Sequence, residues 1–339
     1  MSKKGVLLVN LGTPDSPSTA DVRKYLREFL MDPLVIDINP VGRTLLVKGI
    51  IVPTRGPKSA KLYQEIWDEE TGSPLLYYSQ LQQKLLQEKL GDEYVVELGM
   101  RYQSPSIASA LQRLKDALIY DIIVIPLFPQ YASASTGSVY DKVMELVRQW
   151  MTKPTIRFIN SFHDDELMIE TFADNARKYK PETYDHVLFS FHGLPQRQLI
   201  KSDHTRHTCL KSADCCQTLS DANRFCYSAQ SHHTAKLIAE KLNIPKEKYI
   251  VCFQSRLGND PWVQPYTVDV VRNMAKEGKK RLLVFCPAFV ADCLETVYEV
   301  PVEYGTEFKK LGGEEVQLVE SLNDSPKFID ALAKMVKSS

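Results

Sequence analysis

Residues 188–195 read LFSFHGLP and join a short apolar run to a histidine. Val187, Leu188 and Phe189 are apolar residues bounded by polar ones, which predicts a buried strand. His192 and Gly193 follow, so an imidazole lies at the carboxyl end of that strand. Ligands bind at this edge in open α/β sheets. His192 is therefore either part of a ligand site or a hydrogen-bonded structural histidine. The rest of the sequence is needed to distinguish the two.

Strand-like and helix-like segments alternate along the chain. The strands are predicted at residues 6–10, 94–98, 122–127, 155–160, 187–191, 250–254, 281–286 and 316–319. The helices are predicted at residues 19–30, 107–118, 139–150, 172–179, 234–242, 268–276, 294–300 and 328–336. Such alternation is typical of βαβ units and parallel sheets. We therefore expect an α/β fold of two similar doubly wound domains that face a central cleft.

A faint internal repeat supports two domains. MRYQSP (100–105), a helix and IIVIPLFPQYA resemble QSRLG (254–258), a helix and LLVFCPAFVAD. We expect one domain over residues 1–160 and a second over 161–339, with a closing helix at 325–337 packing back on the first. No glycine-rich dinucleotide or P-loop motif follows any strand, so these two kinds of phosphate site are excluded.

The overall composition limits the possible partners. The 339 residues include 42 Lys and Arg and 42 Asp and Glu, which gives a formal charge of zero and argues against nucleic acid. The N-terminal run VLLVNL is too short for a signal peptide or a membrane span, which favours a cytoplasmic protein. Seven cysteines in such a chain indicate thiols or metal ligands rather than disulfides.

Two stretches interrupt the alternation. Residues 29–51 are apolar, but Pro33, Pro40 and Gly42 exclude one long helix. They form either part of the domain core or an apolar lip that touches a bilayer surface peripherally. Residues 201–233 are polar and rich in His and Cys, and are interpreted as an insertion in the second domain.

Acidic residues follow the predicted strand at 281–286. Glu295 and Glu299 share one face of a predicted helix, and Asp292 lies one turn earlier. Like charges at this spacing repel, so the cluster is costly unless a cation or a proton resides there. A solvated acidic face, or Asp292 as a helix cap, is the alternative. An imidazole with carboxylates suits divalent metal binding or proton transfer.

Further residues suit a flat apolar ligand that carries carboxylates, because they supply aromatic rings, hydroxyls and fixed cations. These candidate substrate-binding residues are Arg55, Tyr63, Ser73, Arg101, Tyr102, Tyr131, Thr136 and Trp262.

Eight segments resemble the ferrochelatase family, in the family's order and over nearly the whole chain. They are VNLGTP (9–14), RGP (55–57), YQEIWDEETGSPLL (63–76), MRYQSP (100–105), PLFPQYASASTGS (126–138), SFHGLP (190–195), FQSRLGNDPWVQP (253–265) and PAFVADCLETVYE (287–299). The resemblance implies Rossmann-like domains of the chelatase superfamily that hold a porphyrin. It implies insertion of Fe²⁺ into protoporphyrin IX with release of two protons, the last step of haem biosynthesis. It assigns catalysis and the substrate iron to His192 and Glu295, and leaves open which is base and which is ligand.

Four cysteines are crowded into the insertion. Cys209, Cys215, Cys216 and Cys226 have the spacing C-x5-C-C-x9-C, which predicts a metal site. The spacing is not that of zinc knuckles, and four thiolates can also hold a [2Fe–2S] cluster. Similarity to a bacterial ferrochelatase subgroup with such an insertion favours [2Fe–2S]. Zinc held by the same thiolates, or with His204 or His207, is the alternative.

Three other functions are alternatives for the chain. They are a coproporphyrin ferrochelatase, a cobalt chelatase, and a porphyrin or haem carrier without catalysis. The presence of both His192 and Glu295 argues against the carrier. The sequence does not indicate the oligomeric state.

Overall fold

The computed structural model describes residues 3–258 and 260–339. The chain divides into two compact units, and each is described by itself. Unit 1 contains the residues up to Phe128, residues 132–160 and residues 329–339. Unit 2 contains residues 129–131 and residues 161–328.

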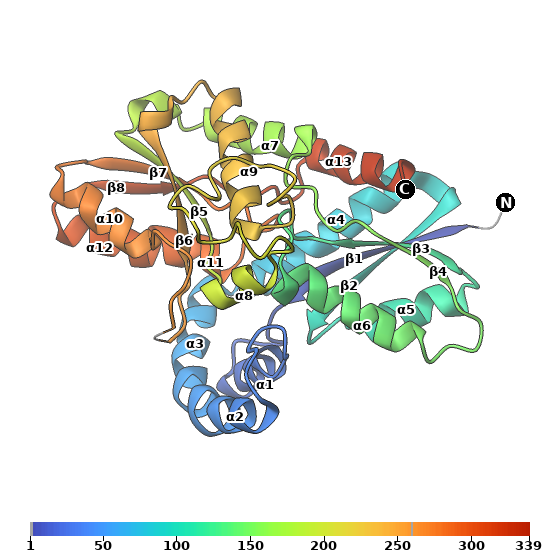
Figure 1. Cartoon of the computed structure of the whole chain (residues 1–339). Helices are drawn as coiled ribbons and strands as arrows, with labels where there is room; N and C mark the ends of the chain where they lie inside the picture. Colours follow the sequence, from blue (N-terminus) through green and yellow to red (C-terminus); the bar gives the residue numbers. More distant parts are fainter. Residues whose placement is uncertain (1–2, 259) are drawn as a thin grey trace. The chain divides into compact units, whose positions relative to one another are not determined.

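Unit 1 is built on a four-stranded parallel sheet in the order β2-β1-β3-β4 (Figure 1). Its strands are β1 (Lys4–Gly12), β2 (Tyr94–Tyr102), β3 (Asp121–Pro126) and β4 (Thr155–Phe158). The central strand β1 buries Val6, Leu7, Leu8 and Val9 completely. A strand covered on both faces has no polar alternation, which explains the continuous apolar runs in the sequence.

Unit 1 also contains the helices α1 (Thr19–Leu30), α2 (Pro40–Thr44), α3 (Val52–Ile66), α4 (Pro74–Leu90), α5 (Ile107–Asp116) and α6 (Ser138–Val147), with π-helical segments at Leu45–Ile51 and Ser133–Gly137. Helices α4, α5 and α6 contact the sheet, whereas α2 packs on the first π-helical segment and α3 packs on α1. Leu111 and Leu114 of α5 and Val143 of α6 pack with Leu7 and Val9 in one core. The apolar spacing predicted for α5 therefore marks its buried face.

Unit 2 repeats the plan with the sheet order β6-β5-β7-β8, again all parallel. Its strands are β5 (His186–His192), β6 (Tyr249–Gln254), β7 (Arg281–Phe285) and β8 (Glu315–Leu318). Its helices are α7 (Glu166–Arg177), α8 (Gln196–Lys201), α9 (Tyr227–Lys241), α10 (Thr267–Lys276), α11 (Leu294–Val297) and α12 (Gly305–Lys310). The same strand order in both units confirms the prediction of two similar parallel α/β sheets.

The last helix, α13 (Pro326–Lys337), begins in unit 2, and its residues from Ile329 onward belong to unit 1. In unit 2, Lys327 pairs with Asp174 at 2.5 Å. In unit 1, Asp330 pairs with Lys89. The chain therefore returns to the first unit after completing the second.

Helix α3 and helix α4 were missed by the sequence analysis. Asn39 caps α2 through its side chain, which accepts from the Gly42 N–H at 2.8 Å, and Pro40 occupies the first helical position. The chain then stays helical through Leu45–Ile51 into α3, which contains Pro57. A proline at the first position costs nothing because its missing N–H has no helical partner there. The gap between α1 and α2 agrees with the expectation that residues 29–51 do not form one helix.

The irregular part of the predicted insertion at 201–233 is shorter than expected. Helix α9 begins at Tyr227, seven residues before the predicted start. Its first turns bury Ser228, Gln230 and Ser231, so they lack the apolar periodicity that the prediction required. Residues 202–226 form turns and carry the four cysteines.

The core of unit 2 depends on an aromatic pair between β5 and β7. Phe189 is fully buried and stacks on Phe285 with ring centroids 4.8 Å apart. Replacing Phe189 by alanine is expected to lower the free energy of unfolding by about 3–5 kcal/mol, because a cavity remains between the strands. Urea unfolding measures this loss. Met151→Ala, at a residue that is 97% exposed, is the control and is expected to stay within about 0.5 kcal/mol of wild type. Equal losses in both variants would contradict the packing argument.

Candidate functional site

His192 is the last residue of β5, as the sequence predicted. Its Nδ1 lies 2.7 Å from the Gly193 carbonyl oxygen. Because a carbonyl only accepts, Nδ1 carries the proton and Nε2 carries the lone pair. The His192 carbonyl accepts from the Tyr227 hydroxyl at 2.9 Å, which fixes the backbone at this point. His192 therefore presents a nitrogen that can accept a proton or bind a metal ion.

Trp262 lies beside this histidine. Its ring centroid is 6.5 Å from that of His192, and Trp262 forms an isolated bridge with Pro195. A Cβ on Gly193 would lie 2.8 Å from the Gln254 carbonyl oxygen and 3.0 Å from the Trp262 ring, so only glycine fits between them. The Trp262 indole Nε1 is buried and has no hydrogen-bond partner among the described residues. A ligand oxygen is the partner that such a donor would take.

The carboxylates lie on α11 and on the π-helical segment Glu299–Tyr304 that follows it. The Glu299 carboxylate accepts from Ser255 Oγ at 2.9 Å, from Gln254 Nε2 at 3.1 Å and from the Tyr304 hydroxyl at 3.3 Å. Burial, and then the charge of Glu295, raise the pKa of Glu299 to about 8. Glu299 therefore holds a proton at pH 7 despite its three donors.

Gln254 lies on the strand next to His192 and is hydrogen-bonded to the segment that carries the carboxylates. It is the register partner of His192 in the neighbouring strand, and its Nε2 donates to the Glu295 carbonyl at 2.8 Å as well as to the Glu299 carboxylate. Ser190 Oγ donates to Gln254 Oε1 at 2.6 Å and so fixes the orientation of the amide. Sequence reasoning missed Gln254 and Ser255. The signal was present, because both residues follow a predicted strand at the same sheet edge.

Asp292 is surrounded by donors from the protein. Its carboxylate accepts from Asn323 Nδ2 at 2.7 Å, from Thr296 Oγ1 at 3.0 Å and from the Ser321 N–H at 3.2 Å. These contacts hold the turn that leads into α11. Burial raises the pKa of the neighbouring Cys293 well above its usual value, so this residue stays a neutral thiol.

The predicted substrate-binding residues are divided between the units. Tyr131 and Trp262 belong to unit 2, and the others belong to unit 1. Within unit 1, Arg101 pairs with Asp32 at 2.5 Å, and the Tyr102 hydroxyl donates to the same carboxylate at 2.9 Å. The remaining four are the exposed Arg55 and the buried Tyr63, Ser73 and Thr136.

The four cysteines of the insertion gather around a cavity of about 20 Å³ that Asp203, His204 and Phe225 also line. The Sγ atoms of Cys215 and Cys216 are 3.4 Å apart, and those of Cys216 and Cys226 are 3.9 Å apart. Asp203 accepts from the Cys209 N–H at 2.8 Å and from the Thr208 N–H at 3.0 Å, which folds the loop around the thiols. These backbone hydrogen bonds hold the pKa of Asp203 well below its usual range.

Cys216 is common to the two short sulfur contacts, because its Sγ lies near that of Cys215 and near that of Cys226. A single tetrahedral zinc would bring all four sulfur atoms to about 3.8 Å from each other. A cluster with two iron atoms binds its four thiolates as two separate pairs. The four thiols line one cavity and are therefore close enough to share a metal centre of either kind.

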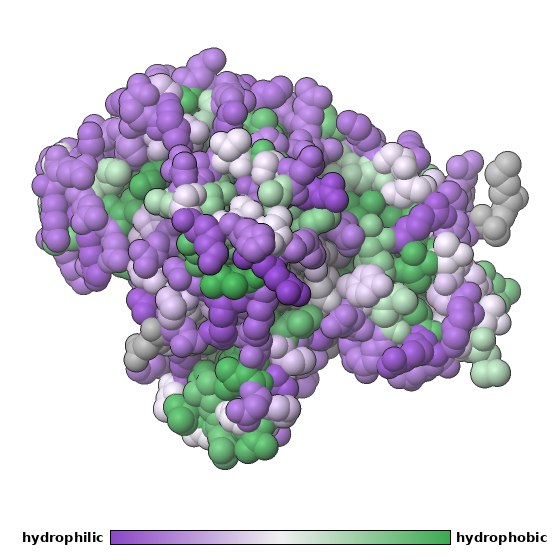
Figure 2. Space-filling model, viewed as in Figure 1, coloured by the Kyte–Doolittle hydropathy of each residue, from purple (hydrophilic) through white to green (hydrophobic). Residues whose placement is uncertain are grey.

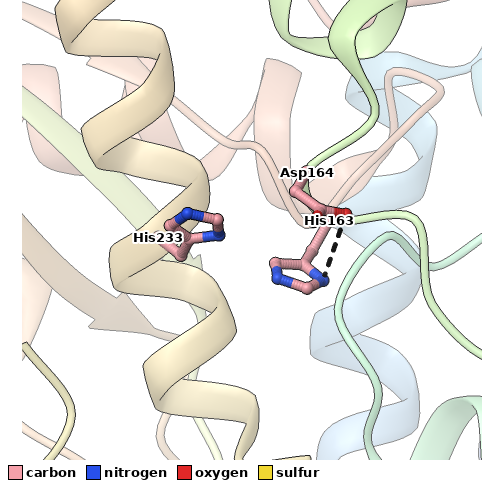
Figure 3. A group of neighbouring side chains, drawn as sticks. All are labelled: His163, Asp164 and His233. Atoms are coloured by element: carbon pink, nitrogen blue, oxygen red, sulfur yellow. Dashed lines mark ion pairs between the residues drawn. The ribbon is translucent and has the colours of Figure 1, made fainter. Parts of the chain in front are cut away.

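A third group was not predicted from the sequence. His163, Asp164 and His233 come together in unit 2 (Figure 3). His163 and His233 are far apart in the sequence, and they lie outside the predicted strand ends. No local pattern therefore indicates the group.

Similarity to solved structures places the fold in a class. The chain is similar to SirB from Bacillus subtilis with Fe³⁺, with a TM-score of 0.51 and 12% identity over 99% of this chain and 95% of that one. It is also similar to the sirohydrochlorin chelatase SirB from Bacillus subtilis subspecies spizizenii in complex with cobalt, with a TM-score of 0.50 and 10% identity over 99% and 94% of the two chains. This chain therefore shares the α/β fold of these two structures.

Sequence similarity identifies the family. The family model "Ferrochelatase" matches residues 3–339. The ferrochelatase of Coxiella burnetii (strain Dugway 5J108-111) is 44% identical over 100% of this chain and 94% of its own length. The ferrochelatase of Legionella pneumophila (strain Lens) is 42% identical over 98% of both chains. The chain belongs to the ferrochelatase family.

Proposed function

We propose that this protein inserts Fe²⁺ into protoporphyrin IX, with release of two protons, as the last step of haem biosynthesis. Membership of the ferrochelatase family over residues 3–339 supports metal insertion into a porphyrin. The observation that carries the proposal is that Gln254, the register partner of His192, donates to the Glu295 backbone carbonyl and to the Glu299 carboxyl group at the edge of one sheet.

Metal insertion requires that two pyrrole N–H protons leave the porphyrin. His192 Nε2 has a lone pair, and imidazole accepts a proton near neutral pH. Glu295 is half-buried and lies one turn before Glu299, which is protonated at pH 7. We assign His192 and Glu295 to the reacting atoms and Glu299 to a relay of protons behind them. Asp292 is a positioning residue, because its oxygens already accept from three protein donors.

The substrate assay separates the possible functions. Anaerobic incubation with Fe²⁺ and protoporphyrin IX is expected to convert the porphyrin spectrum to that of haem. Faster turnover of coproporphyrin would instead identify a coproporphyrin ferrochelatase. Tight porphyrin binding without haem formation would identify a carrier and overturn the enzymatic proposal.

We further propose that Cys209, Cys215, Cys216 and Cys226 hold a [2Fe–2S] cluster. The four thiols line one cavity, and their C-x5-C-C-x9-C spacing is not that of zinc knuckles, which supports the cluster. The cluster would supply a covalent connection across residues 202–226. Metal insertion changes no oxidation state, so electron transfer is not required of it.

Metal analysis tests the cluster. Anaerobically purified protein is expected to be reddish and to contain iron and sulfide in equal amounts. Cys226→Ala is expected to lose most of both, because a cluster with three thiolates is incompletely coordinated. Cys252→Ala is the control, since this thiol is buried in β6 away from the insertion. Colourless protein that contains zinc would contradict the assignment.

The apolar lip at residues 29–51 is proposed to contact a bilayer peripherally. Val41, Leu45 and Ile50 are 70%, 67% and 58% exposed, and Figure 2 shows apolar side chains gathered over α2. Val47 and Ile51 of the same segment are buried, so the segment has one inner and one outer apolar face. Among the described residues, no helix is long and apolar enough to cross a membrane. Exposed apolar side chains of this kind are typical of interfacial contact.

Vesicle binding tests the lip. Wild-type protein is expected to sediment with vesicles of phosphatidylcholine and phosphatidylglycerol. The double variant Leu45→Glu, Ile50→Glu is expected to lose most of this binding, because two charges would enter the interface. Met151→Glu adds a charge at another exposed apolar residue and is expected to bind like wild type. Equal binding of all three proteins would contradict the proposal.

A further inference from the structure

We propose that His163, Asp164 and His233 form an additional binding site for a divalent transition-metal ion of the zinc, nickel or cobalt class. This site shares no residue with the His192 site or with the four cysteines. One nitrogen of each imidazole and one carboxylate oxygen of Asp164 all lie within 4.8 Å of one another. Figure 3 shows His233 on α9 pointing toward His163 on the loop before α7.

The backbone holds the two imidazoles in place. Thr234, the neighbour of His233, donates its hydroxyl to the His163 carbonyl at 2.7 Å and so attaches the loop to the helix. The two rings have centroids 5.5 Å apart, and His163 Nδ1 lies 3.9 Å from Asp164 Oδ1. The group is therefore preorganised by contacts that leave His163 Nε2 and His233 Nδ1 available.

The hydrogen bonds around Ser161 define the tautomer of His163. Ser161 Oγ lies 2.8 Å from the Pro129 carbonyl and 2.9 Å from His163 Nδ1. A carbonyl only accepts, so the hydroxyl donates to Pro129, and the His163 Nδ1–H donates to Ser161 Oγ. The lone pair then lies on Nε2. Metal-binding histidines donate their second ring nitrogen to an outer partner in the same way.

Two imidazole nitrogens lack partners at this place. His163 is 8% exposed, and its Nε2 is buried without a hydrogen-bond partner in the part of the chain that the structure describes. His233 Nδ1 is also buried without one. An unsatisfied buried polar atom is costly, and an ion is one of the few ways to satisfy it. Two such atoms in neighbouring histidines point to a shared ligand.

The loop that carries His163 has a counterpart in the chain, which shows how the same turn looks without the histidine. Residues 161–165 (SFHDD) and 321–325 (SLNDS) precede α7 and α13 and form equivalent turns, with Asp165 N–H donating to the Phe162 carbonyl and Ser325 N–H to that of Leu322. Asn323 takes the place of His163 in the second loop and donates to Asp292 at 2.7 Å. The Asn323 side chain in the second loop thus has a hydrogen-bond partner. His163 Nε2 in the first loop has none among the described residues.

The donor set defines the class of ion. Two imidazoles and one carboxylate suit borderline first-row divalent ions rather than calcium or magnesium. Metal–nitrogen distances of about 2.0–2.1 Å require the ligand atoms to approach to about 3.3 Å. Asp164 is exposed, so its side chain is free to make most of this movement. Three protein ligands leave positions for water, and the ion is therefore exchangeable.

Calorimetric titration of the full-length protein with Ni²⁺ tests the site. Wild type is expected to bind one more Ni²⁺ than His233→Ala, and Asp164→Asn is expected to weaken that site more than tenfold. The matched control is His232→Gln, because His232 lies next to His233 but its Nδ1 is 2.9 Å from the Ser228 carbonyl. We expect this control to bind like wild type.

Thermal unfolding gives a second readout that does not depend on activity. Ni²⁺ is expected to raise the Tm of wild type and of His232→Gln but not that of His233→Ala. Asp164→Asn changes only an exposed side chain, so its loss of affinity cannot come from misfolding. Equal stoichiometry and affinity in wild type, His233→Ala and Asp164→Asn would overturn the proposal. An equal loss in His232→Gln would also overturn it.

Discussion

Replacing His192 by alanine is expected to lower kcat for iron insertion by about 10²–10⁴-fold, the range typical of losing a general acid or base. The Gly193 carbonyl holds the Nδ1 proton, so Nε2 is the only nitrogen of this residue that carries a lone pair. In His192→Ala, no imidazole remains at the end of β5 to accept a pyrrole proton or to bind the incoming ion. Anaerobic assays with Fe²⁺ and protoporphyrin IX measure the loss.

His232→Gln is the matched control for this loss, because it removes an imidazole from the same unit and leaves the end of β5 unchanged. Its kcat is expected to stay within a factor of two or three of wild type, and its KM for porphyrin is expected not to change. The Tm of His192→Ala is expected to stay close to that of wild type, since His192 is only half-buried. A normal rate for folded His192→Ala would remove this residue from the reaction.

Much of the fold was predictable because the central strands of both sheets are buried on both faces. IIVIPL at 122–127 and RLLVFC at 281–286 are continuous apolar runs, and each forms the third strand of its sheet. Helix α9 was predicted too late in the sequence because its first turns bury polar residues, which the protein satisfies with specific hydrogen bonds. Tertiary contacts of this kind leave no periodic signal in the sequence.

The candidate site was predictable only in part, for a related reason. A histidine at a strand end is visible in the sequence, and so is a ladder of acidic residues after another strand. The role of Gln254 cannot be read from the sequence, because it depends on the register between β5 and β6 and on the approach of α11. The pairing of His163 with His233 depends in the same way on how a loop lies against a helix.

The Glu299 carboxyl is expected to make stability fall as the pH rises. Its pKa is about 8 in the folded protein and 4.5 in the reference state, mainly because burial disfavours the charged form. Between these two values the folded chain holds a proton that the unfolded chain has released, so the free energy of unfolding decreases with increasing pH. At 1.36 kcal/mol per pKa unit, the full decrease is up to about 5 kcal/mol.

Glu299→Gln tests this assignment, since glutamine keeps the shape of the neutral carboxyl but cannot ionise. The variant is expected to be more stable than wild type at pH 9 and to approach it at pH 5, as measured by urea unfolding at each pH. Glu307→Gln is the control, because Arg272 donates to that carboxylate and lowers its pKa, so it stays ionised throughout this window. If wild type and Glu299→Gln lost the same stability between pH 5 and pH 9, the proton would not reside on Glu299. A flatter profile for Glu299→Gln alone would show that the acidic cluster stores a proton at neutral pH, next to the residues that we propose remove two protons from the porphyrin.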